Sequence, residues 1–371
     1  PAVIINLLIT YLVYRGTKAS KNFSNVMVYI KLAIIALVII VGAFYIDIDN
    51  WTPFMPNGFS GVMGGVSAVF FAYIGFDAVS TLAEESKNPQ RDLPKGMIYS
   101  LVICTVVFIV LALVITGMVS YQLLGVSDPL AEIFALKGVK WMLFIVSIAA
   151  VVAMTSVLLV FQMGQPRIWM TMSRDGLMPK KFAEIHPKYK TPGFATIVTG
   201  LVVGIPLFFT DENFVLDFTS IGTLFAFVLV CGGVLMLSPQ SSEEIAERAT
   251  KGKFRIPYVN SKFIFPSIVV LATLLIINYV PTFFSDVFDF SVGKMATNIP
   301  MLVFLLVCVV MSVLSVLKNL SLIPLLGLVS CCYLLTGMAV SNWMWFGVWL
   351  VIGLIFYFLY GYKNSKLNLS K

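Results

Sequence analysis

The sequence predicts an all-α protein that crosses a membrane many times, and three observations carry this prediction. Hydrophobic residues make up 59% of the 371 residues, whereas charged residues make up 12%, which is about half of their usual share. The mean hydropathy is +0.95. The apolar residues form long runs without the period-two alternation of membrane β-strands. A soluble fold, a disordered chain, a coiled coil and a disulfide scaffold are therefore excluded.

The apolar runs define the expected helices. The first run, 1–14, is shorter than the roughly 20 residues of a membrane span, so the chain is expected to begin inside a helix. Most of the later runs reach the length of a span, and they cover 23–46, 59–82, 96–120, 139–163, 192–210, 213–237, 262–282, 299–317, 321–340 and 343–362. The loop 121–138 is expected to add a short amphipathic helix, and the loop 238–261 is polar and basic.

The positive charges predict the orientation of the chain. Of the 25 lysine and arginine residues, all but four lie in alternate loops and in the C-terminal tail. By the positive-inside rule these loops face the cytoplasm, and so does the C-terminus. The net charge of +7 is thus explained by topology, and a nucleic-acid partner is excluded.

The reactive residues do not favour an enzyme or a metal site. The five cysteines all lie inside apolar runs, and there is a single histidine, His186, in a basic loop. The sequence has no nucleophile beside a base and no phosphate-binding loop. We therefore expect no enzyme activity and no cofactor, and the sequence identifies no partner subunit.

Lys31 is the first candidate functional residue, because it lies inside the run NVMVYIKLAIIALVIIVG. Eight residues from Phe23 correspond to a depth of about 12 Å. A lysine at that depth usually faces a cavity or a partner, and burial disfavours its charged form, which suits a proton carrier. The alternative is a lysine whose long stem reaches back to the membrane surface.

The run 59–82 is the second candidate, since it contains several glycines and carries Asp77. A membrane helix could break near Gly75 and leave free N–H and C=O groups for the ends of a substrate. The alternative for Gly61 and Gly65 is close packing of helices through small residues. Asp77 is either a functional acid or a cap of the resumed helix, and the cap is favoured.

The third candidate is the segment 149–179. Thr155 and Ser156 are hydroxyls in an apolar helix, where most such groups bond to a carbonyl one turn earlier. Met154, beside them, would ordinarily be a packing or lipid-facing residue.

Two long motifs carry a family resemblance. FFAYIGFDAVSTLAEESKNPQRDLPKG (70–96) and VLLVFQMGQPRIWMTMSRDGLMP (157–179) resemble the sixth and eighth helices, with their cytoplasmic loops, of the amino acid–polyamine–organocation permeases. The segment 22–44 is similar to their fifth helix. FRIPYV (254–259) and the segment 349–367 are similar to the C-terminal part of the cationic amino acid transporter branch.

The resemblance implies a LeuT-like fold of five plus five inverted helices with additional C-terminal helices. Residues 1–371 would form a single transmembrane permease domain that lacks the first three helices. Within it, 1–46 would hold helices four and five, 59–237 helices six to ten, and 262–362 four C-terminal helices. Two of these, 262–282 and 299–317, depart from the shorter bacterial pattern.

The resemblance also implies where a substrate and a proton would bind. The substrate would lie at the break of the run 59–82, with its ammonium group on carbonyls of Phe71, Ala72 and Ile74, beside Gly75. Phe71 or Phe76 would gate the pocket. Met154 lines up with a pocket position where an apolar residue suits neutral side chains. Lys31 matches a family lysine that replaces a sodium ion near hydroxyls of the eighth helix such as Thr155 and Ser156.

We therefore expect an amino acid transporter in the bacterial cytoplasmic membrane, with the proton as the coupling ion. An amino acid/polyamine exchanger is the alternative within the same class. A transporter-like sensor or regulatory membrane subunit is the alternative from another class. The expected partners are a small amino acid substrate and the lipid bilayer.

Overall fold

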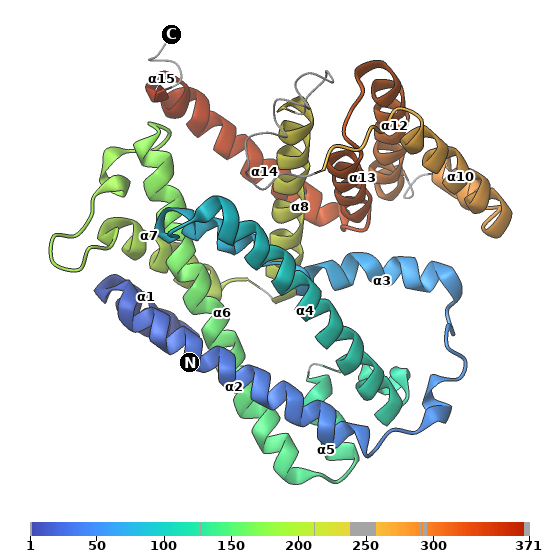
Figure 1. The fold of residues 1–371 in the computed structure, drawn as a ribbon, viewed down its shortest axis with the longest axis horizontal. Coiled ribbons are helices and arrows are strands. Elements are labelled where there is room, and N and C mark those ends of the chain that lie inside the picture. The colour runs from blue at the N-terminus through green and yellow to red at the C-terminus, as the bar shows by residue number, and fades with distance from the viewer. Residues whose placement is uncertain are drawn as a thin grey trace. The chain divides into compact units, whose positions relative to one another are not determined.

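A computed structural model describes residues 2–126, 128–210, 212–237, 257–289, 291 and 295–366 (Figure 1). Within this part of the chain, each of the eleven apolar runs contains a helix and no strand occurs, apart from an isolated bridge between Asn260 and Ser321. The prediction of an all-α fold is confirmed. Most of the basic loop expected over 238–261 lies outside the described residues.

Six of the described helices are long and apolar enough to span a membrane. Four other apolar helices are shorter than a span. The ends of these helices differ from the ends of the apolar runs in the sequence. In the run 192–210, for example, the α-helix stops at Gly204, ahead of Pro206, because proline lacks the N–H that would continue it. The chain is a multi-pass membrane protein.

The helices separate into two compact units, and each is considered by itself. The first unit comprises Pro1–Gly61, Gly75–Thr210 and Gly353–Lys371. Its main helices are α1 (Ala2–Arg15), α2 (Thr17–Ala43), α4 (Pro89–Met118), α5 (Pro129–Leu136), α6 (Lys140–Arg174) and α7 (Gly193–Gly204). Gly16, with φ of 135°, separates α1 from α2. Helix α2 thus begins six residues before the expected run.

The core of the first unit forms where α2, α4, α5 and α6 meet. Helix α5 is the short amphipathic helix expected in the loop 121–138, and it buries Ile133 and Phe134 in this core. The Asp128 side chain caps α5 by accepting a hydrogen bond of 3.3 Å from the N–H of Ala131. The loop helix is therefore held firmly against the ends of the membrane helices.

A buried polar contact joins α1, α6 and α7 in the same unit. Gln162 donates to the Asn6 side chain at 2.7 Å, and Asn6 donates to the carbonyl of Gly200 at 3.0 Å. Both side chains are 1% exposed. Because an unpaired amide in an apolar interior is costly, this pairing fixes the register of the three helices.

The second unit comprises Val62–Ile74 and Asp211–Ile352. It contains most of α3 (Gly58–Tyr73) and of α14 (Val340–Phe356), and the helices α8 (Glu212–Leu237), α10 (Ile264–Tyr279), α12 (Met295–Lys318) and α13 (Leu322–Thr336). Helices α8 and α13 pack side by side (Figure 1). Asn342 on α14 is buried and donates to Asp217 on α8 at 2.8 Å.

Candidate functional site

The run 59–82 is interrupted where the glycine pattern predicts a break. Helix α3 ends at Tyr73, and a 3-10 helix, η2, begins at Phe76 and ends at Glu85. Gly75 between them has φ of +120°, which L side chains rarely adopt. The predicted discontinuity is confirmed, and its position is set by the one residue type that tolerates this backbone.

Asp77 closes the turn at the break. Its carboxylate accepts a hydrogen bond of 3.2 Å from the N–H of Gly75, and the N–H of Ala78 donates to the Gly75 carbonyl at 3.1 Å. The Asp77 side chain thus stabilises the non-helical turn before η2. The alternative role, a functional acid, stays a prediction.

The carbonyl of Ile74 accepts no hydrogen bond from any described residue. A free carbonyl at the end of a helix is the kind of group that holds an ammonium. Ala72 is exposed and Phe76 is half-buried, while the side chain of Phe71 lies outside the described residues. The substrate-binding and gating roles of these residues stay predictions.

Lys31 contacts α6 as expected. Its ammonium donates to the Ser156 hydroxyl at 3.0 Å, across 125 positions of sequence. Lys31 is half-buried and Ser156 is 2% exposed. Because Ser156 lies near the middle of the 35-residue helix α6, Lys31 is turned toward a neighbouring helix rather than back to the membrane surface. The proximity predicted for these two residues is confirmed, and their role in proton coupling stays a prediction.

Thr155 and Met154 are placed differently from Ser156. The Thr155 hydroxyl donates to the carbonyl of Val151 at 2.7 Å, one turn earlier, which is the ordinary use of a hydroxyl in an apolar helix. Of the two expected hydroxyls, Ser156 is thus the one that meets Lys31. Met154 exposes 72% of its surface, and its role in a pocket stays a prediction.

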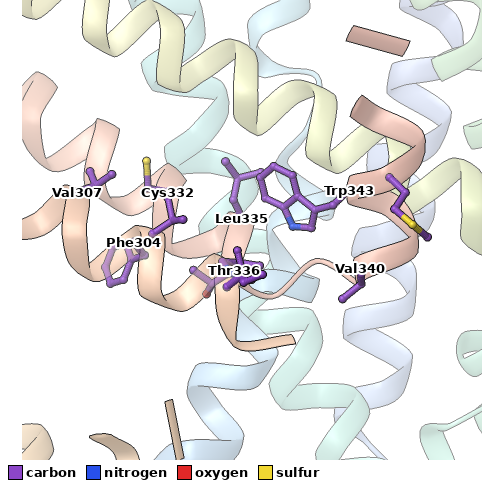
Figure 2. A pocket seen from close by; sticks show the side chains of 11 residues that line it. Phe304, Val307, Cys332, Leu335, Thr336, Val340 and Trp343 are labelled. Atoms are coloured by element: carbon purple, nitrogen blue, oxygen red, sulfur yellow. The ribbon is translucent and has the colours of Figure 1, made fainter. Parts of the chain in front are cut away.

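Two of the cavities are lined by described residues that lie within a single unit. The larger, of about 450 Å³, lies in the second unit between α12, α13 and α14 (Figure 2). It is lined almost wholly by apolar side chains, and the buried indole N–H of Trp343 has no hydrogen-bond partner among the described residues. Because an amino acid carries two charged groups that each need a partner, this apolar cavity is unsuited to such a substrate.

The smaller cavity, of about 180 Å³, lies in the first unit beside Lys31. Its walls come from α2, α4, α5 and α6, and Asp128 also lines it. Asp128 is not among the residues predicted from the sequence, although an aspartate before Pro129 and an apolar stretch is a typical start of a helix. Asp217, an acid inside the run 213–237, was not predicted either.

Comparison with known proteins identifies the family. The described residues form a multi-pass helical membrane protein with a broken helix and a lysine turned toward a neighbouring helix. Residues 2–289 match the family model described as amino acid permease, and 320–365 match the C-terminus of that family. The chain therefore belongs to the amino acid permease family, within the amino acid–polyamine–organocation superfamily, as the resemblance implied.

Several similar proteins carry transporter names. The chain is 35% identical over 369 residues to the branched-chain amino acid permease BcaP of Bacillus subtilis. This alignment covers 99% of this chain and 65% of BcaP. It is also 35% identical over 370 residues to the methylthioribose transporter of the same organism, with the same coverage. The cationic amino acid transporter 9 of Arabidopsis thaliana is 39% identical over 251 residues, 67% of this chain and 44% of that protein.

The chain spans 65% of the length of the two Bacillus relatives. Between the two matched segments, 290–319 corresponds to neither family model, and α12 falls in this interval. The relatives are named as transporters and permeases rather than enzymes, which agrees with the expectation from the sequence.

Proposed function

We propose that this chain moves amino acids across the bacterial cytoplasmic membrane by alternating access, with a proton as the coupling ion and its C-terminus in the cytoplasm. Membership of the amino acid permease family supports transport of this substrate class. The observation that supports the proton as the coupling ion is the 3.0 Å hydrogen bond between Lys31 and Ser156, since an ammonium can take the place of a sodium ion beside a hydroxyl. No cofactor is required.

The break at Gly75 would supply the substrate contacts. The end of α3 carries the negative end of a helix dipole, which suits the ammonium of an amino acid, and the Ile74 carbonyl, which accepts from no described residue, could accept from it. Within a LeuT-like inverted repeat, this end would lie near the middle of the membrane. Phe71 and Phe76 would then close over the bound substrate.

Lys31 would alternate between two protonation states. In the charged state its ammonium donates to Ser156 and holds α2 against α6. In the neutral state the nitrogen no longer attracts the hydroxyl as strongly, because a charged donor makes the stronger bond. A change in the contact between these two helices would therefore accompany proton release.

Uptake into liposomes tests the proposal. The protein, isolated from its host membrane and reconstituted, is expected to accumulate labelled leucine or alanine when the outside is made acidic. A protonophore is expected to abolish the accumulation. Uptake that requires internal amino acid and ignores the pH gradient would establish exchange instead. Binding of substrate without any flux would favour a sensor.

The proposal that the substrates have neutral side chains rests on Met154. A thioether accepts hydrogen bonds only weakly, so a cationic side chain beside it would lose its water without gaining a partner. The name of the Bacillus branched-chain amino acid permease also fits a neutral side chain, whereas the Arabidopsis relative is named a cationic amino acid transporter.

Met154→Ser is therefore expected to admit cationic amino acids. Such a change of one side-chain group alters discrimination by about 1–3 kcal/mol, or about 10- to 200-fold. The measurement is inhibition of labelled alanine uptake by arginine in the wild type and the variant. Equal inhibition of both would show that Met154 only packs, and the preference for neutral substrates would lose its support from the sequence.

A further inference from the structure

The cavity beside Lys31 connects this residue to a second ionisable group. Asp128 lines the same 180 Å³ cavity, although it lies 97 positions further along the chain. Among the described residues that line it, Lys31 and Asp128 are the ionisable ones. Helix α4 contributes only Leu111, and α6 contributes Val146, Ala149, Ala150 and Ala153.

The order of the lining residues gives the cavity a direction. On α2 the lining residues extend from Lys31 to Val38, which is about 10 Å along a helix. On α6 they extend from Ala153 back to Val146, toward the end that joins α5. Because Asp128 caps the start of α5, it belongs at the loop end of the cavity, and Lys31 belongs at the end within the span.

The exposure of the two side chains agrees with this direction of the cavity. The Asp128 side chain is exposed, whereas Lys31 is half-buried and hydrogen-bonded to the buried Ser156. A carboxylate at the mouth of an otherwise apolar cavity attracts protons from the solvent. A cavity of this volume with polar groups at both ends can hold several water molecules, which would relay a proton between them.

We propose that Asp128 collects protons from the loop side and loads them through this cavity onto Lys31. In the loading step a proton from water joins the Asp128 carboxylate. It then passes along the bridging water to the neutral Lys31 nitrogen, so that the carboxylate is restored and an ammonium is formed. The proposal rests on the proposed function, and by the predicted orientation the loop side is the outside of the cell.

Asp128→Asn tests the proposal without removing the helix cap, since asparagine caps a helix as well as aspartate does. Loss of the carboxylate removes the group that takes protons from the loop side, so loading of Lys31 requires a higher external proton concentration. The midpoint of uptake against external pH is therefore expected to move toward acid. A move of about one unit would lower the uptake rate at a pH above the wild-type midpoint by up to about tenfold.

Two controls separate proton loading from general effects. Glu132→Gln removes an acid from the exposed face of the same short helix, outside the cavity lining, and is expected to leave the pH profile unchanged. Counterflow of amino acid at equal pH on both sides requires no net proton uptake and is expected to be unaltered in Asp128→Asn. If Asp128→Asn does not accumulate in the membrane, Asp128→Ser, which also keeps a capping oxygen, takes its place.

The outcomes are distinguishable. An acid shift in the Asp128 variant alone supports the proposal, and it should vanish when Lys31 is also replaced by methionine. A wild-type pH profile in the Asp128 variant overturns the loading role and leaves proton coupling by Lys31 standing. Equal shifts in the Asp128 and Glu132 variants indicate only a surface-charge effect and also overturn it. Uptake by the wild type that ignores pH would instead refute the proposed function.

Discussion

Lys31→Met is expected to remove the response of transport to pH while leaving amino acid exchange in place. Methionine has nearly the length of lysine but carries no proton, so no step of the cycle can load or release one. The ratio of uptake rates at acidic and alkaline external pH should fall close to one, and accumulation driven by a pH gradient should cease. Both quantities are measured with labelled amino acid in liposomes.

Lys31→Arg is the matched control for the charge. An arginine can still donate to Ser156, but it does not lose its proton at any pH that the protein experiences. This variant is therefore also expected to lose proton-driven accumulation, although it keeps a cation at the site. Unchanged pH-dependent uptake in the methionine variant would contradict the role of Lys31.

Gly75→Ala is expected to reduce transport by at least tenfold. The nearest heavy atom to an added Cβ is Cζ of Phe161 at 3.8 Å, so the substitution causes no collision. The cost comes from the backbone, because a φ of +120° strains any L residue by about 1–3 kcal/mol. The variant would relieve this strain by changing the turn that Asp77 closes, and the carbonyls at the break would move.

Gly65→Ala in the preceding helix, α3, is a suitable comparison. No heavy atom lies within 4 Å of the Cβ that this substitution adds, and Gly65 lacks the positive φ of Gly75. Its uptake rate should stay close to that of the wild type, because alanine suits a helix better than glycine does. Similar losses in both variants would mean that the backbone at Gly75 has no special importance for transport.

The existence and order of the membrane helices could be predicted from the sequence, whereas their ends could not. A run of apolar residues indicates a segment that prefers lipid, and this preference does not depend on which helix packs beside it. The ends depend on local backbone chemistry: Gly16 separates two helices, and Pro206 ends α7 early. The lysine and arginine residues of the loops likewise predict the orientation of the chain in the membrane, because this prediction needs only their positions in the sequence.

The candidate site was predicted in part for a similar reason. An ionisable residue inside a membrane span costs free energy unless it has a functional role. Lys31, and Gly75 with the nearby Asp77, could therefore be predicted as site residues from the sequence. The choice of Ser156 over Thr155 was not, because adjacent residues on a helix face different directions and only packing shows which one meets α2.

The sequence by itself determined that this protein is a multi-pass helical member of the amino acid permease family with a break near Gly75 and a lysine within a span. Only the tertiary structure decided what these residues contact. It placed Asp128, a loop residue, on the cavity that reaches Lys31, and it paired Asn6 with Gln162. The physical reason is that hydropathy and turn preference are properties of neighbouring residues. A shared cavity or a buried hydrogen bond, in contrast, depends on how distant helices pack.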